Sequence, residues 1–244
     1  MRNSSSTIRD CIDSVKSQCI QPEHLFVDGG STDGTLDIVR GMDQEFSKVV
    51  SEPDNGVYDA LNKGIALATG EVIGILHGDD TYADREVLSR IKKVFEDNRV
   101  DSCYGDLVYV DRKKTERIVR CWHSGAYDVR RFYWGWMPPH PTFFVRRKIY
   151  EKFGGYKLSF GTAADYELML RFLVRHRISS VYIPAILVKM RTGGVSNISL
   201  MNRLRANRMD RKAWRENGLK PLPFTHILKP LSKIGQYAMI RSGG

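Results

Sequence analysis

Acidic side chains follow two short apolar runs of this 244-residue chain, and their type and spacing suit them to chemistry. Asp28 comes directly after the run at 24–27, and Asp79 and Asp80 come shortly after the run at 72–76. Charge at the end of an apolar strand carries a desolvation cost, which a bound cation or a hydrogen-bonding ligand would offset. Adjacent carboxylates are hard ligands suited to Mg²⁺ or Mn²⁺ on a diphosphate. For the aspartate pair alone, a solvated turn with a helix cap is an equally good interpretation.

The glycine-rich segment after the first run, Asp28-Gly-Gly-Ser-Thr-Asp-Gly-Thr35, differs from the common phosphate and calcium loops. No Gly-Lys-Ser/Thr follows it, which excludes a P-loop, and it lacks the ligand spacing of an EF-hand. We predict a glycine turn in which Asp33 caps the next helix. Asp28 precedes that turn and stays a candidate binding residue.

A further acidic residue, Asp165, opens a strongly amphipathic helical pattern. It could cap that helix, where the positive end of the helix dipole favours an anion. It could also act as a general base that takes a proton from a hydroxyl. Position alone favours the cap.

The elements that must position these acids alternate along the first half of the chain. This alternation predicts an α/β fold with a mostly parallel sheet and helices on both faces. In such sheets ligands bind beyond the carboxyl ends of the strands, where Asp28, Asp79 and Asp80 would lie. The predicted helices are 8–15, 36–42, 57–68, 85–96 and one from 165; the predicted strands are 24–27, one near 49, 72–76, one near 104, a hairpin over 107–122, and 142–145.

Charge is concentrated at the end of the chain. The net charge is +10, and about +8 of it lies from residue 196 onward. A basic helix is predicted over 202–214, followed by a segment at 224–239 in which apolar and basic residues alternate. Such a tail is typical of a surface that lies on anionic lipid, although a helix packed on the main domain with a solvated basic face is the alternative.

Other bulk features narrow the class of protein. The four cysteines lack the spacing of a zinc site or disulfide framework. No apolar run approaches the length needed to span a bilayer, and the start lacks a signal-peptide pattern. These features predict a cytosolic or peripheral protein.

Taken together, the motifs resemble family 2 glycosyltransferases with the GT-A (nucleotide-diphospho-sugar transferase) fold, in the bacterial branch that builds O-antigen and exopolysaccharide. The resemblance extends over about residues 3–196. It implies a catalytic domain at 1–196 and a basic helical or amphipathic tail at 197–244. The motifs are 28–35, 51–70, Leu76-His-Gly-Asp-Asp80, Tyr104-Gly-Asp106, His140-Pro-Thr-Phe-Phe144, Gly154-Gly-Tyr156, Ala164-Asp-Tyr-Glu-Leu168 and Gly193-Gly-Val-Ser196.

The resemblance implies a donor-binding role for four residues. Asp28 would hold the nucleotide base, and Asp54 and Lys63 would line the pocket for the base and phosphates. Asp79 would face the ribose or the donor sugar. The donor would be a nucleoside-diphosphate sugar, with UDP as the nucleotide expected.

The resemblance also implies the reaction. Asp80 would bind a divalent cation, Mn²⁺ or Mg²⁺, which stabilises the leaving diphosphate. Asp165 would be the general base, reversing the preference from position alone, and direct displacement would invert the anomeric centre. His140 could touch the acceptor or the metal, but a structural role is favoured.

The implied setting is cell-surface polysaccharide synthesis. The acceptor would be a glycan or an undecaprenyl-diphosphate-linked glycan, and the enzyme would be peripheral at the inner face of the plasma membrane. No nucleic-acid partner is expected. Two alternatives remain: a nucleotidyltransferase that makes nucleotide sugars, which would need a basic N-terminal phosphate loop that is not visible, and a non-catalytic nucleic-acid binder that uses the tail.

The chain departs from the family at its start. Members normally begin with an apolar strand that ends in Pro-Thr-Tyr-Asn, and Asn3 matches that final Asn. We therefore expect a fragment or a misassigned start, a sheet without its first strand, two exposed strand edges and part of the nucleotide pocket missing.

Overall fold

The computed structural model describes residues 1–42, 47–193 and 200–225. Two parallel strands, β1 (His24–Asp28) and β2 (Ser47–Ser51), form a small sheet. A larger sheet has the order β3-β7-β5-β8-β4, with β6 pairing β5 off this path. Its strands are β3 (Val72–Ile73), β4 (Thr81–Tyr82), β5 (Ser102–Val110), β6 (Ile118–Trp122), β7 (Phe144–Arg146) and β8 (Ser180–Arg191).

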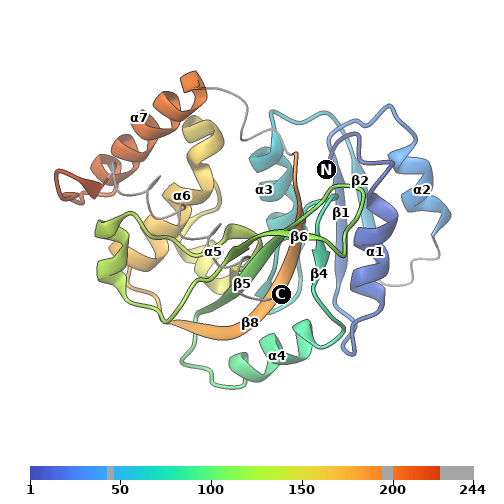
Figure 1. The fold of residues 1–244 in the computed structure, drawn as a ribbon, viewed down its shortest axis with the longest axis horizontal. Coiled ribbons are helices and arrows are strands. Elements are labelled where there is room, and N and C mark those ends of the chain that lie inside the picture. Colours follow the sequence, from blue (N-terminus) through green and yellow to red (C-terminus); the bar gives the residue numbers. More distant parts are fainter. Residues whose placement is uncertain (43–46, 194–199, 226–244) are drawn as a thin grey trace.

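Helices cover these sheets, so the predicted α/β class is confirmed (Figure 1). The first four are α1 (Ile8–Lys16), α2 (Thr35–Gly41), α3 (Val57–Leu67) and α4 (Val87–Phe95); α5 (Arg147–Phe153), α6 (Ala164–Met169) and α7 (Leu200–Glu216) follow. The chain continues from α6 as a π-helix over Leu170–Arg175. Three 3₁₀ segments lie at Val129–Trp134, His140–Thr142 and Leu158–Ala163.

The expectation of a mostly parallel sheet is wrong. Among the described strands, β1·β2 and β5·β8 pair in parallel, whereas β3·β7, β4·β8, β5·β6 and β5·β7 pair antiparallel. The cause lies in the second half of the chain, where the β5–β6 hairpin and the return of β7 reverse the strand direction. The central β5·β8 pair stays parallel, and Asp80 and Arg191 lie where β4 and β8 meet the site described below.

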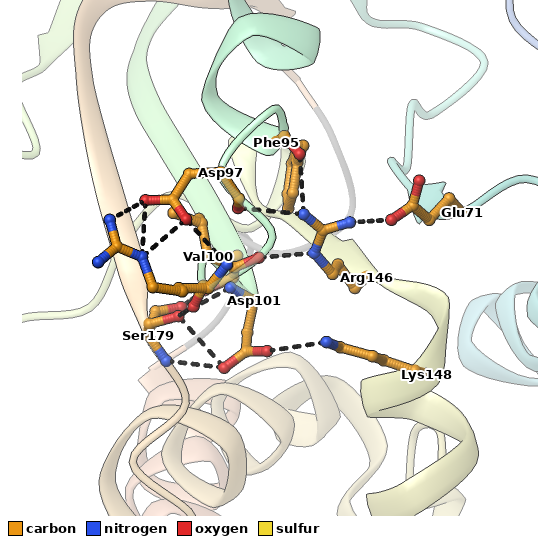
Figure 2. A network of polar contacts seen from close by, with 10 residues as sticks. Glu71, Phe95, Asp97, Val100, Asp101, Arg146, Lys148 and Ser179 are labelled. Carbon is orange, nitrogen blue, oxygen red and sulfur yellow. Dashed lines mark hydrogen bonds and ion pairs between the residues drawn. The ribbon is translucent and has the colours of Figure 1, made fainter.

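A buried arginine fastens the end of β7 to its surroundings (Figure 2). Arg146 is 2% exposed. Its guanidinium donates to the carbonyl oxygens of Val100 at 2.7 Å and Phe95 at 2.8 Å, and it pairs with Glu71. A cluster of apolar side chains that includes Phe95 packs between α4, β5 and β8. Arg146 thus joins β7, the end of α4 and the start of β3.

The last described helix packs on the rest of the molecule. Trp214 of α7 is fully buried, and its Nε1 donates to the Tyr166 hydroxyl of α6 at 2.8 Å. Its ring also lies 4.9 Å from that of Tyr133. The predicted basic helix at 202–214 is therefore confirmed, whereas most of the predicted amphipathic segment at 224–239 lies outside the described residues. None of the described helices has the length and apolar character needed to cross a bilayer.

Candidate functional site

A cavity of about 2400 Å³ has walls that include residues of β1, β3, α1 and α3. Three of the predicted site residues, Asp54, Asp79 and Asp165, line it together. The other three predicted residues, Asp28, Lys63 and Asp80, are not among its lining residues. The three aspartates reach the cavity from three separate segments of the chain.

A tight turn presents the aspartate pair. The Asp80 amide donates to the His77 carbonyl at 3.0 Å, and the Thr7 hydroxyl of the segment before α1 donates to the Gly78 carbonyl at 2.9 Å. Asp79 is half-buried and faces the cavity, while Asp80 is fully buried. The two carboxylates therefore differ in exposure although they are adjacent in the chain.

Neither carboxylate oxygen of Asp80 has a hydrogen-bond partner within the part of the chain that the structure describes. Burial raises the pKa of this carboxyl well above its usual range, and Asp79 raises it further, while Arg191 only partly opposes the shift. A buried, unpartnered carboxylate is costly, so a ligand that it could bind would relieve that cost.

The carboxylate pair fits a hard divalent cation in part. The described residues contain no group of three or more His, Cys, Asp or Glu side chains able to hold a metal. Mg²⁺-type ions are commonly bound by one or two carboxylates, with substrate phosphates and water as the remaining ligands. The free oxygens of Asp80 beside Asp79 meet that smaller requirement.

Arg191, the last residue of β8, lies beside this turn. Its guanidinium pairs with Asp10 of α1 and approaches the Asp79 carbonyl oxygen at 3.5 Å. It is 5% exposed, so a cation is buried next to the acidic turn. The sequence does not indicate the contact with Asp10, because the two residues are 181 positions apart.

Asp165 lies in the first turn of α6 and is not its N-cap. The helix begins at Ala164, the N-cap is Ala163, and no side chain caps it. The Asp165 carboxylate accepts the Tyr166 amide at 2.7 Å and lines the cavity. The capping role favoured by position is therefore wrong in detail, and the carboxylate lies where a cavity ligand could reach it.

Two histidines and a tyrosine lie near the acidic residues of the cavity. His140 Nε2 and the Tyr156 hydroxyl lie 2.6 Å apart, and the His140 and His77 rings are 6.0 Å apart. Burial lowers the pKa of each histidine to about 4, so both are neutral at pH 7. Burial likewise raises the pKa of Tyr156 well above its usual range. The predicted structural character of His140 agrees with this contact, although His140 also lines the cavity.

Asp28 is fully buried at the end of β1 and organises its own turn. It accepts hydrogen bonds from the Ser31 amide at 3.0 Å and the Ser51 hydroxyl at 2.8 Å. Burial would raise its pKa, but these hydrogen bonds outweigh burial and lower it. A side chain at Gly29 would come within 2.0 Å of Asp54, so the glycine lets the segment after β2 approach this turn closely.

Asp54 and Lys63 hold the neighbouring segment. Asp54 accepts the Gly56 amide at 2.9 Å just before α3. Lys63 pairs with Glu52 at 2.8 Å and donates to the Pro53 carbonyl at 3.1 Å. The ion pair with Glu52 raises the pKa of Lys63. Lys63 therefore does not line the cavity but holds the segment that carries Asp54.

The chain is similar to a known protein family and to known proteins. The family described as "Glycosyl transferase family 2" matches residues 1–154. A relative from Mycobacterium tuberculosis (strain ATCC 25177 / H37Ra), named "PGL/p-HBAD biosynthesis glycosyltransferase", is 30% identical over 201 residues, which is 80% of this chain and 76% of that protein.

Solved structures share the fold. S. aureus TarS 1-349 in complex with UDP superposes with a TM-score of 0.70 at 17% identity, covering 100% of this chain and 72% of that one. The mannosyltransferase PcManGT from Pyrobaculum calidifontis, in complex with GDP-Man and Mn²⁺, gives 0.63 at 18% identity, covering 100% and 74%. Against a longer TarS structure this chain covers 38% of that protein.

Proposed function

The chain belongs to glycosyl transferase family 2 and is a glycosyltransferase with the GT-A fold, and we propose that it is an inverting enzyme that moves a sugar from a nucleoside-diphosphate donor, UDP being the expected nucleotide, to an acceptor hydroxyl. The acceptor is a glycan or a lipid-linked glycan of the undecaprenyl-diphosphate type, used in cell-surface polysaccharide synthesis. Membership of this family favours sugar transfer over the alternative of a nucleotidyltransferase.

One observation carries the proposal: Asp79 and Asp165 face the same cavity, and the unpartnered Asp80 lies beside Asp79. Asp165 takes the proton of the acceptor hydroxyl. The acceptor oxygen then bonds to the anomeric carbon while the bond from that carbon to the diphosphate oxygen breaks. The diphosphate leaves with the electron pair, and the configuration inverts.

The leaving diphosphate needs charge stabilisation. Asp80 would hold the divalent cation, Mn²⁺ or Mg²⁺, and Asp79 would orient the ribose or the donor sugar beside it. When bound, the cation acts as a Lewis acid on the diphosphate oxygens. Because His77 and His140 are neutral at pH 7, they add no charge that would compete with the cation.

The nucleotide would lie over the turn after β1. Ser31 and Ser51 fix the Asp28 carboxylate. Its Oδ2 accepts from the Ser31 amide and the Ser51 hydroxyl, whereas its Oδ1 accepts from the Ser31 hydroxyl and retains a second lone pair for a base N–H group. Asp54 closes the pocket from the segment after β2, and Lys63 braces that segment through Pro53. This arrangement supports donor binding by Asp28, Asp54 and Lys63, with Lys63 acting indirectly unless it exchanges its partner Glu52 for a phosphate.

We also propose peripheral association with an anionic membrane at the inner face of the plasma membrane, where a lipid-linked acceptor would be found. Arg208, Arg211 and Arg215 follow one another at helical spacing and are all exposed on α7. Trp134 and Phe224 are 57% and 40% exposed, and their rings lie 5.4 Å apart. Basic residues with exposed aromatic rings favour the polar–apolar boundary of anionic lipid.

The enzymatic proposal is tested by nucleotide release. Purified protein is assayed with UDP- and GDP-linked sugars, each with Mn²⁺, Mg²⁺ or EDTA, in the presence of candidate acceptors. With the active donor, Asp165→Asn should lower kcat by at least about 100-fold, because a positioned general base contributes roughly 10²–10⁴. Donor binding, measured by calorimetry, should stay within about twofold.

Asp37→Asn supplies the matched control. Asp37 is also an aspartate in the first turn of a helix, α2, but it is exposed and does not line the cavity. Its variant should keep wild-type kcat. Normal transfer by Asp165→Asn would show that Asp165 is not the base.

A further inference from the structure

Helix α3, on the donor side, and the helical segment that continues α6, on the base side, both hold the short segment at residues 153–156. On the α3 side, Asn62 Nδ2 donates to the Tyr156 carbonyl at 2.8 Å, and the Tyr156 amide donates to Asn62 Oδ1 at 2.8 Å. The side-chain amide thus pairs with one residue's backbone as a β-strand partner would. This contact joins residues 94 apart in the chain.

The loop is shaped to admit that contact. A Cβ on Gly155 would lie 2.4 Å from Asn62 Oδ1. Real Cβ atoms do not approach an oxygen so closely, so only glycine at 155 lets Asn62 reach the Tyr156 backbone without a shift. The close approach of the Asn62 side-chain amide therefore explains why the second residue of the Gly154-Gly155 pair is a glycine.

The opposite side of the loop is held from the helix that carries Asp165. Arg171, in the π-helix that continues α6, donates to the carbonyl oxygens of Gly154 at 2.9 Å and Gly155 at 2.6 Å. Arg171 is fixed in turn by the fully buried Glu167, at 3.1 Å. The loop is thus bound by Asn62 on one side and by Arg171 on the other.

The loop also contacts residues that line the cavity. The Tyr156 side chain is 4% exposed, and its hydroxyl lies 2.6 Å from His140 Nε2. Its ring lies 5.2 Å from that of Tyr58, which is on α3 and donates weakly to the Thr162 carbonyl just before α6. The backbone of Tyr156 therefore holds α3, while its side chain contacts His140 and Tyr58, which line the cavity.

We propose that Asn62 is a positioning residue: through Tyr156 it fixes α3, which borders the donor pocket, relative to Asp165 on α6. The inference rests on the proposed roles of Asp165 and the donor pocket. A small displacement between a base and a reacting centre costs up to about 100-fold in rate, because proximity and alignment supply much of the acceleration. Asn62 does not line the cavity, so its loss should change alignment more than binding.

Asn62→Ala should lower kcat by roughly 10- to 100-fold while the donor KM changes by less than about threefold. It should also raise the share of donor that is hydrolysed instead of transferred, because water needs less precise alignment than the acceptor.

The matched control is Gln18→Ala. Gln18 is 3% exposed, donates to the Asp84 carbonyl at 2.7 Å and accepts the Leu88 amide at 3.0 Å, so it makes the same kind of clamp between α1 and α4. Its variant should lose comparable stability and keep the wild-type ratio of transfer to hydrolysis.

A double-mutant cycle tests the mechanism of the clamp. Gly155→Ala alone should also lower kcat, because its new methyl group displaces Asn62. In the double variant that methyl group meets no side chain, so kcat should equal that of Asn62→Ala alone. Multiplying effects would overturn the proposal, as would a wild-type transfer ratio in Asn62→Ala.

Hydrogen exchange separates this proposal from the enzymatic one, since it needs no substrate. The Tyr156 amide should exchange at least tenfold faster in Asn62→Ala than in wild type or in Gln18→Ala, measured at matched global stability. Unchanged exchange would show that the clamp is absent. Faster exchange in a protein that transfers no sugar from any donor would keep the clamp and reject the enzymatic role.

Discussion

At the scale of single residues, the most informative group is the Asp80 carboxylate, because its burial has no compensating hydrogen bond within the described structure. We predict that Asp80→Ala removes the stabilisation that Mn²⁺ and UDP together give to the wild-type protein. A ligand at 100 times its Kd stabilises by about 2.7 kcal/mol. Thermal unfolding with EDTA, Mn²⁺, UDP, or both measures this difference.

The control for that prediction is Asp84→Ala. Asp84 lies four residues further along the chain, but it is partly exposed and pairs with Arg90 at 2.9 Å. Its variant should respond to Mn²⁺ and UDP as the wild type does. A full response by Asp80→Ala would remove Asp80 from the cation site and leave the charge of the diphosphate to other groups.

The buried His140 should make the stability of the folded protein depend on pH. Burial lowers its pKa to about 4, against 6.5 for an ordinary histidine. As pH falls below 6.5 the unfolded chain binds a proton that the folded chain does not, so stability present above pH 6.5 is lost progressively toward pH 4. At about 1.4 kcal/mol per pKa unit, the loss from this residue is roughly 3 kcal/mol at most.

Urea unfolding of His140→Gln at several pH values between 7.5 and 4.5 measures this contribution. The variant should be less stable at pH 7.5, because the contact with Tyr156 changes, but its stability should fall less steeply with acid. His77 keeps a similar dependence, so the slope should decrease and not vanish. An unchanged slope would mean that His140 is protonated equally in both states.

At the scale of elements, Arg146 is a buried side chain that holds β7, the end of α4 and the segment before β3 together. We predict that Arg146→Leu costs roughly 3 kcal/mol in the free energy of unfolding, because several buried carbonyl oxygens lose their donor and each unsatisfied group costs about 1–3 kcal/mol. Urea denaturation measures it. Arg147→Leu is the matched neighbour: its guanidinium is 39% exposed and donates to one carbonyl, so its loss should cost under about 1 kcal/mol.

The sequence predicted the elements whose signal is local. The helical spacing of α1, α3 and α4 and the hairpin β5–β6 are all found close to their expected ranges. The strand expected over 72–76 is shorter, because only β3 pairs with β7. These elements are defined by their own apolar pattern or by a turn between them.

The strand β8 was not predicted, although it is the longest described. Pro184 interrupts it and lacks an N–H for the ladder, and the β5·β8 register shifts on either side of Asp106. Its burial pattern is therefore neither a clean alternation nor a continuous apolar run. Such a strand is specified by its neighbours, which a single sequence does not reveal.

The sequence indicated which residue types form the candidate site better than it indicated how these residues are arranged in space. Acids at the ends of apolar runs identified Asp79, Asp80 and Asp28, and two of these acids lie away from the cavity surface. The contacts of Asn62 with Tyr156 and of Arg191 with Asp10 were missed. They join segments far apart in the chain, and neither residue type indicates its partner.

At the scale of the whole molecule, the basic helix α7 borders the cavity through Asn207, Met209 and Asp210, while its arginines at 208, 211 and 215 are exposed. Figure 1 shows α7 beside α6 on one side of the molecule and α4 below the larger sheet. α7 is held to the domain by Trp214, so its exposed arginines are displayed at a fixed orientation. A rigid basic face can orient the cavity relative to a lipid surface, which a flexible tail cannot do.

We predict that the protein binds vesicles containing about 30% phosphatidylglycerol and binds neutral vesicles weakly, measured by flotation at 50 and 200 mM salt. Each basic residue near an anionic surface contributes about 1 kcal/mol, so changing Arg208, Arg211 and Arg215 to Gln should weaken binding by roughly 100-fold. The matched control removes the same charge from the exposed residues Lys92, Lys93 and Arg99, around α4. Equal loss in both triple variants would indicate attraction by net charge alone, and tighter binding to duplex DNA than to the vesicles would reject the membrane as the partner of this face.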